Sequence, residues 1–79
     1  MDNATAYSHR SKKGFFWIVR RPDGLWHAMW ENEDLGAYPT PQQAADDLAG
    51  GATYWPSCGN PAAFGLSDDI GDWTRHGPR

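Results

Sequence analysis

The stretch GFFWIVRRPDGLWHAMWENEDLGAYPTPQQAADDLAGG, residues 14–51, decides the fold of this 79-residue chain. Its opening residues are mostly aromatic and β-branched, which predicts a strand over residues 14–20. The Pro-Asp-Gly triplet at residues 22–24 predicts a three-residue hairpin loop, because Pro presets a type I turn and Gly can follow in the left-handed conformation. A second strand over residues 25–31 then returns beside the first.

The hairpin register follows from this turn, which places Arg21 opposite Leu25. One face of the hairpin would carry Phe16, Ile18, Arg20, Trp26, Ala28 and Trp30. The other face would carry Phe15, Trp17, Val19, His27, Met29 and Glu31. The register favours Trp26 and Trp30 beneath the helix that follows, with Trp17 as the alternative. Both faces are apolar, and a wet apolar face of this size usually marks a contact surface.

A short third strand over residues 35–38 and a helix over residues 41–49 complete the unit. The helix signal is strong, because Thr40 is a good N-cap, Pro41 suits the first helical position and Gln43 completes a capping box. A glycine pair at residues 50–51 ends the helix. Its inner stripe of Pro41, Ala44, Ala45 and Leu48 is small, so we expect one short helix to cover one sheet face only.

The sequence therefore predicts a small α+β domain with a three-stranded antiparallel sheet and one helix on one face. Residues 52–73 are rich in Gly and Pro with apolar islands, and we expect them to wrap irregularly over the other face, anchored by Trp55 and Trp73. Single helical turns are expected after Asn60 and Ser67. Residues 1–13 are expected to form a flexible basic arm, residues 14–73 the domain and residues 74–79 a frayed tail. A second copy in a homodimer is the alternative cover.

Charge is distributed unevenly, although the net charge is only −3. Residues 22–74 contain no Lys or Arg and nine carboxylates, whereas five of the seven basic residues fall within the first 21. The single cysteine, Cys58, rules out an internal disulfide and fits a reducing compartment. No signal peptide or membrane-spanning run is evident, so we expect a cytoplasmic protein.

No residue pattern predicts catalysis, a metal site or a cofactor. His9, His27, His76 and Cys58 lack the spacing of metal-ligand pairs, and His27 in mid-strand is expected to be packed and hydrogen-bonded. A catalytic Cys58 would need a neighbouring base or helix terminus, which its loop does not offer. We therefore expect that the protein is not an enzyme.

The segment LGAYPTPQQAA, residues 35–45, resembles a junction found in two families: the plant ethylene-response-factor DNA-binding domain and the arm-binding domain of tyrosine integrases. The resemblance covers about residues 14–50 and implies a β-β-β-α fold that places Arg and Trp side chains in the DNA major groove. Here the second and third predicted strands and the helix contain no basic residue. The charge pattern opposes phosphate binding, which supplies most non-specific affinity.

Two functional hypotheses follow. The first is a protein-interaction module that binds a basic partner surface through Glu31, Glu33, Asp34, Asp46 and Asp47. By size and charge it is similar to phage-encoded inhibitors of bacterial defence complexes, such as anti-CRISPR proteins that mimic nucleic acid. The second is a nucleic-acid-binding module that uses Arg10, Lys12, Lys13, Arg20 and Arg21.

Overall fold

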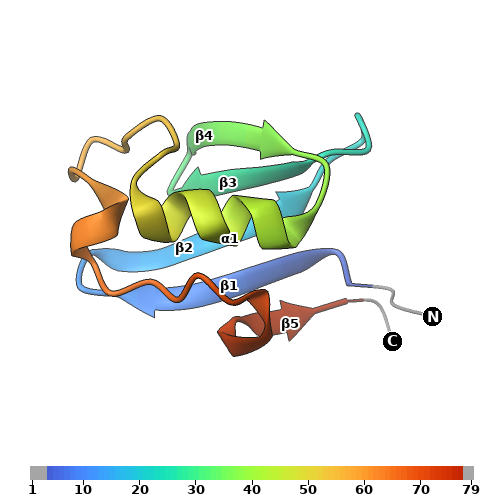
Figure 1. The fold of residues 1–79 in the computed structure, drawn as a ribbon. Coiled ribbons are helices and arrows are strands. Elements are labelled where there is room, and N and C mark those ends of the chain that lie inside the picture. Colours follow the sequence, from blue (N-terminus) through green and yellow to red (C-terminus); the bar gives the residue numbers. More distant parts are fainter. Residues whose placement is uncertain (1–3, 78–79) are drawn as a thin grey trace.

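The computed structural model describes residues 4–77 and contains a five-stranded antiparallel sheet with one α-helix (Figure 1). The elements in chain order are β1 (Ala6–Ser11), β2 (Gly14–Arg20), β3 (Trp26–Trp30), β4 (Glu33–Tyr38), α1 (Pro41–Gly50), two short 3-10 helices η1 (Pro61–Ala63) and η2 (Ile70–Asp72), and β5 (Thr74–His76). The strand order is β4-β3-β2-β1-β5, so β2 is central. The prediction of a three-stranded sheet is wrong, while the mixed α+β class stands. Residues 1–3 of the expected arm and 78–79 of the expected tail lie outside the described residues.

The two unexpected strands, β1 and β5, come from segments that the sequence assigned to an arm and a tail. β1 pairs with β2 through a two-residue turn, since Ser11 lies opposite Gly14. β5 then pairs with β1, with Ala6 opposite His76. β1 is polar in sequence, and long-range contacts hold it: the ring of Tyr7 lies 5.7 Å from that of Trp26.

The β2–β3 hairpin has the predicted register. Phe16 lies opposite Trp30, Ile18 opposite Ala28 and Arg20 opposite Trp26. The Arg21 amide donates to the Leu25 carbonyl across the loop, at 3.0 Å. The face assignment that follows from this register is therefore confirmed, with the Trp26 and Trp30 face toward the helix. β4 begins at Glu33, earlier than predicted, because a bulge between Ala28 and Met29 lets it continue pairing.

Helix α1 begins and ends where its capping residues predict. The Thr40 hydroxyl accepts a hydrogen bond from the Gln43 amide at 3.2 Å. At the other end Gly51 adopts a left-handed conformation, φ +74°, and its amide donates to carbonyls of the last turn. Ala44, Ala45 and Leu48 are fully buried, as the inner stripe predicts.

Gly51 is expected to be much less tolerant of alanine than its neighbour Gly50. A Cβ on Gly51 would lie 2.4 Å from the Asn60 side-chain oxygen, in addition to the left-handed backbone, whereas a Cβ on Gly50 would meet nothing within 4 Å. Gly51→Ala should therefore lower the free energy of unfolding by about 1–2 kcal/mol. Gly50→Ala should leave it unchanged or raise it by up to about 1 kcal/mol. Urea titration of both variants checks this, and equal effects would contradict the cap geometry.

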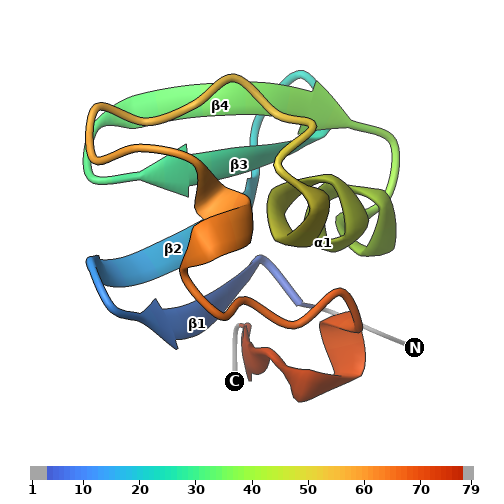
Figure 2. The ribbon, with the colours of Figure 1, turned by 60° about the vertical axis from the view of Figure 1, so that its left-hand side comes forward.

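The C-terminal segment lies on the same sheet face as α1, not on the opposite face (Figure 2). α1 contacts β2, β3 and β4, and both short helices contact α1. Phe64 packs against Phe16, with ring centroids 6.1 Å apart, and Trp73 packs against His9 at 5.0 Å. The expected wrap over the other face is wrong for a physical reason. One ten-residue helix cannot cover five strands, so the C-terminal segment completes the cover over β1 and β2.

The core lies between this covered face and the layer of α1 and the C-terminal segment. Phe16, Ile18, Ala28, Leu35 and the buried stripe of α1 form its centre, and Phe64 and Trp73 close it. Within residues 4–77, no buried side-chain nitrogen or oxygen lacks a hydrogen-bond partner. The buried polar side chains therefore find their hydrogen-bond partners within the described part of the chain.

Candidate functional site: the open face of the sheet

The sheet face opposite α1, called here the open face, is covered by none of the elements described between residues 4 and 77 (Figure 2). Strand alternation places Phe15, Trp17 and Val19 of the central strand on it, with Met29 of β3 opposite Trp17. Phe15 is 48% exposed, and the other three are half-buried. An apolar stripe thus runs along β2.

One flank of the open face is basic or polar and is built from β1 and β5. The Arg10 guanidinium lies 5.8 Å from the centre of the Phe15 ring, in cation–π range. Ser8 and His76 are hydrogen-bonded, with Oγ and Nε2 2.9 Å apart. The His76 ring also lies 5.0 Å from the ring of Trp17. These contacts hold side chains of β1 and β5 against the aromatic side chains of β2.

The other flank is a hydrogen-bonded group of Asp23, His27 and Asp34, called here the Asp–His–Asp group. His27 Nε2 lies 2.8 Å from Asp23 Oδ2, and His27 Nδ1 lies 2.7 Å from Asp34 Oδ2. The imidazole is 14% exposed, and the two carboxylates are 48% and 42% exposed. Asp23 also accepts from the Leu25 amide, and Asp34 from the Gly36 amide. The hairpin loop and the edge strand β4 thus both hold His27.

Protonated His27 fits this geometry best. An ionised carboxylate only accepts hydrogen bonds, and only the imidazolium donates from both ring nitrogens. The hydrogen bond with Asp23, and then that with Asp34, raises the pKa of His27 above its usual value. The Leu25 amide, followed by the hydrogen bond with His27, lowers the pKa of Asp23. The group contains two carboxylates and only one imidazole, so the flank is acidic.

The Asp–His–Asp group makes stability depend on pH. Because folding raises the pKa of His27, its stabilising contribution is full below the unfolded pKa of about 6.5 and is lost as pH rises through the folded value. Folding lowers the pKa of Asp23, so the stability that its carboxylate contributes is present above the unfolded pKa and is lost as pH falls through the folded pKa. Urea midpoints measured from pH 5 to 9 should therefore fall on the alkaline side in the wild type. His27→Gln should be less stable at acidic pH and lack that fall; a fall of equal size in the variant would contradict this assignment.

The acidic residues predicted to bind a partner do not form one surface. Glu33 accepts from the amide and hydroxyl of Ser57, at 2.9 and 2.6 Å, and so holds the loop after α1. Asp34 belongs to the Asp–His–Asp group on the open face. Asp46 and Asp47 lie on α1, on the other side of the sheet. Glu31 is exposed at the β3–β4 turn, in a left-handed conformation with φ +55°.

The basic residues predicted to bind nucleic acid lie at two ends of the sheet. Arg10 is near the end of β1, and Lys12 and Lys13 form the exposed turn to β2. Arg20 and Arg21 lie at the far end of β2, beside the next hairpin loop. The structure therefore brings the first three together and separates them from the last two by the length of a strand.

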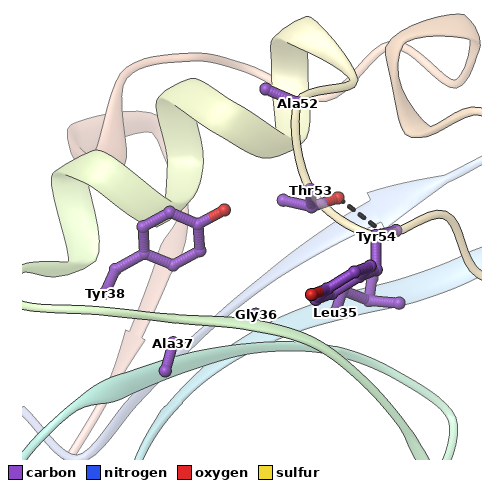
Figure 3. A pocket seen from close by; sticks show the side chains of 7 residues that line it. All are labelled: Leu35, Gly36, Ala37, Tyr38, Ala52, Thr53 and Tyr54. Atoms are coloured by element: carbon purple, nitrogen blue, oxygen red, sulfur yellow. Dashed lines mark hydrogen bonds between the residues drawn. The ribbon is translucent and has the colours of Figure 1, made fainter.

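Two surface hollows lie beside β4. The larger, about 490 Å³, lies between β4 and the chain after α1, with Tyr38 and Tyr54 on its two sides (Figure 3). None of its lining residues is a His, Cys, Asp, Glu or Lys. The second, about 440 Å³, is lined in part by Asp46, Asp47 and Tyr38. Burial, and then its hydrogen bond with Asp47, raises the pKa of Tyr38 to about 12, so its hydroxyl keeps its proton.

Comparisons with protein-family models, curated proteins and solved structures find no match to this chain. Among the described residues, no group of three or more His, Cys, Asp or Glu side chains is arranged to hold a metal ion. In the same part of the chain no helix has the length and apolar character needed to cross a membrane.

Proposed function

We propose that this chain is a non-enzymatic protein-interaction module that binds its partner through the open face of the sheet. The observation that supports this most directly is the placement of α1 and the C-terminal segment on the same face. That placement leaves Phe15 48% exposed, beside Trp17, Val19 and Met29. Contiguous apolar surface with a polar rim is typical of protein contact sites. Aromatic side chains contribute most of the binding energy when such a site is buried.

The open face accounts for binding better than the acidic set does. A protein that mimics a nucleic-acid backbone needs its carboxylates on one surface, facing the basic site of its partner. Asp46 and Asp47 lie across the sheet from Asp34, and Glu33 already accepts two hydrogen bonds from Ser57. The Asp–His–Asp group remains beside the apolar stripe, where it would act as a charged rim, and Glu31 is exposed at the β3–β4 turn.

The chemistry of Cys58 and Ser8 supports a binding role rather than a catalytic one. Burial raises the pKa of the Cys58 thiol, which keeps it protonated and a poor nucleophile. The Ser8 hydroxyl is hydrogen-bonded to His76, but Ser8 is only 5% exposed and lies outside both hollows. Neither group offers a substrate a site where a reacting atom and a general base would meet.

A capture experiment with matched lysine variants tests the proposal. Tagged wild type, Met29→Lys and Asp46→Lys would be exposed to a nuclease-treated bacterial lysate at low and high salt. We expect one discrete protein to be retained by the wild type and by Asp46→Lys. Met29→Lys should lose it by at least about tenfold, because the new charge would have to be desolvated at the centre of the contact. Circular dichroism checks that each variant is folded.

Two results would overturn the proposal. Loss of the captured protein with Asp46→Lys but not with Met29→Lys would place the contact on the acidic side of α1. The second result is recovery of nucleic acid when the nuclease is omitted, with loss of that nucleic acid at high salt and in an Arg20→Glu, Arg21→Glu variant. This result would favour binding through the basic residues, since phosphate contacts weaken steeply with salt.

A further inference from the structure

We infer that the partner seated on the open face is a second copy of this chain, in a face-to-face dimer whose twofold axis runs parallel to β2. This inference rests on the proposed function, because it names the occupant of the same surface. Three features of the open face support it: its apolar centre, its two oppositely charged flanks, and the position of the stripe on the central strand.

The strand order makes the open face self-complementary. β2 is central, so a twofold axis above and parallel to it stacks β2 on the partner's β2 and exchanges the flanks. β3 of one copy then lies over β1 of the other, and β4 lies over β5. Two sheets packed in this way form a sandwich about 10 Å thick, filled by the inward side chains of both copies. Trp17 and Met29 would supply that filling.

Charge decides the direction of the axis. An in-plane axis perpendicular to the strands would place β3 and β4 over their own copies, so that the strands that carry the acidic flank faced each other. An axis parallel to β2 instead places that acidic flank over β1 and β5. Like charges brought together at an interface oppose binding, and opposite charges fix its register. The parallel axis is therefore the favoured one.

The same axis brings one specific pair of charges together. Phe15 pairs with Arg10 on one side. The β2–β3 ladder ends with Phe16 opposite Trp30, so on its other side Phe15 lies level with the β3–β4 turn that begins at Glu31. Exchange of the flanks therefore sets Arg10 of each copy over Glu31 of the other, with Asp34 nearby. Glu31 is exposed in that turn, and Arg10 lies over the Phe15 ring. A symmetric dimer would contain this pair twice.

Charge exchange with complementation is the sharpest test. Sedimentation equilibrium of the full chain, from micromolar to millimolar, should show a monomer–dimer equilibrium for the wild type. Arg10→Glu alone and Glu31→Lys alone each create two like-charged pairs, and each should weaken dimerisation by at least about tenfold. An equimolar mixture of the two variants restores both opposite-charge pairs, and should form a heterodimer close to wild-type strength. Met29→Lys should be monomeric alone and when it is mixed with either of these two variants.

The outcomes separate this inference from the proposed function. A folded wild type that stays monomeric to millimolar concentration overturns the second copy. If the wild type captures another protein from the lysate and Met29→Lys does not, the open face remains the contact surface. If Met29→Lys changes neither self-association nor capture, both proposals fail. A wild-type dimer whose single variants weaken but whose mixture does not recover contradicts the axis parallel to β2 and the Arg10–Glu31 pairing.

Discussion

Replacing Phe16 by alanine is expected to lower the free energy of unfolding by about 3–5 kcal/mol. Phe16 is fully buried on the covered face and packs against Phe64 and Trp30, with ring centroids 6.1 and 6.5 Å apart. Truncation removes its apolar surface from the core and leaves a cavity that the surrounding strands cannot close. A loss of this size is a large part of the roughly 5–15 kcal/mol that stabilises a typical domain.

Phe15 is the matched control, because it is the same residue type one position earlier on the same strand. Phe15→Ala faces the open side, where the ring is 48% exposed and contacts Arg10. In the monomer it should cost no more than about 1 kcal/mol, the scale of an exposed cation–π contact. Urea unfolding at a concentration where the chain is monomeric compares the two. Equal losses would contradict the assignment of a covered and an open face.

Replacing Trp73 by alanine is expected to cost about 3–5 kcal/mol and to release β5 from the sheet. Trp73 is 4% exposed, its indole nitrogen donates to the Ser67 carbonyl at 2.9 Å, and its ring packs edge-on against His9. It therefore links the C-terminal segment to β1. Hydrogen exchange of the strand amides would report the release, since β5 pairs with β1 directly beyond this residue.

Trp55 provides the control for Trp73, because both were expected to anchor the C-terminal segment. Trp55 is 58% exposed, and its indole nitrogen donates to the Gly51 carbonyl at 3.0 Å. Trp55→Ala should cost about 1 kcal/mol, the net value of one hydrogen bond with little burial. Strong destabilisation by Trp55→Ala with little effect of Trp73→Ala would contradict the observed path of the segment.

The parts of the fold that the sequence predicts well are those specified by local chemistry. The loop at residues 22–24 sets the β2–β3 register, and Thr40 with Gly51 sets the limits of α1. Each depends on residues within a few positions of one another. Capping and turn geometry are therefore readable without knowledge of the tertiary structure.

β1 and β5 could not be predicted in the same way, because long-range contacts hold them. The β1–β2 turn contains Lys12 and Lys13, which lack the left-handed preference of a typical two-residue turn. The amide of Ser67 donates to His9, and Ser8 is hydrogen-bonded to His76. Alternation of Tyr7 and His9 with polar residues was the only local signal for β1. Tertiary contacts decided both strands.

The candidate site was predictable only in part. Strand alternation groups Phe15, Trp17 and Met29 on one face, but the path of the C-terminal segment, which leaves this face open, depends on tertiary contacts. His27 was expected to be packed and hydrogen-bonded, and its bonds to Asp23 and Asp34 agree with that. The Arg10 flank depends on β1 and was therefore missed. The acidic residues do not form one set, because proximity in sequence does not show which side of a sheet a carboxylate occupies.

Photo-crosslinking from position 15 shows whether the open face contacts a partner. A photoreactive phenylalanine analogue replaces Phe15 in one tagged protein and Asp46, on α1, in another, and both are irradiated in bacterial cells. The open-face account predicts a discrete crosslinked product from position 15 and none from position 46; a product of twice the 8.8 kDa chain mass would identify the second copy. A product from position 46 alone, or none from position 15 in a folded protein, would contradict the account.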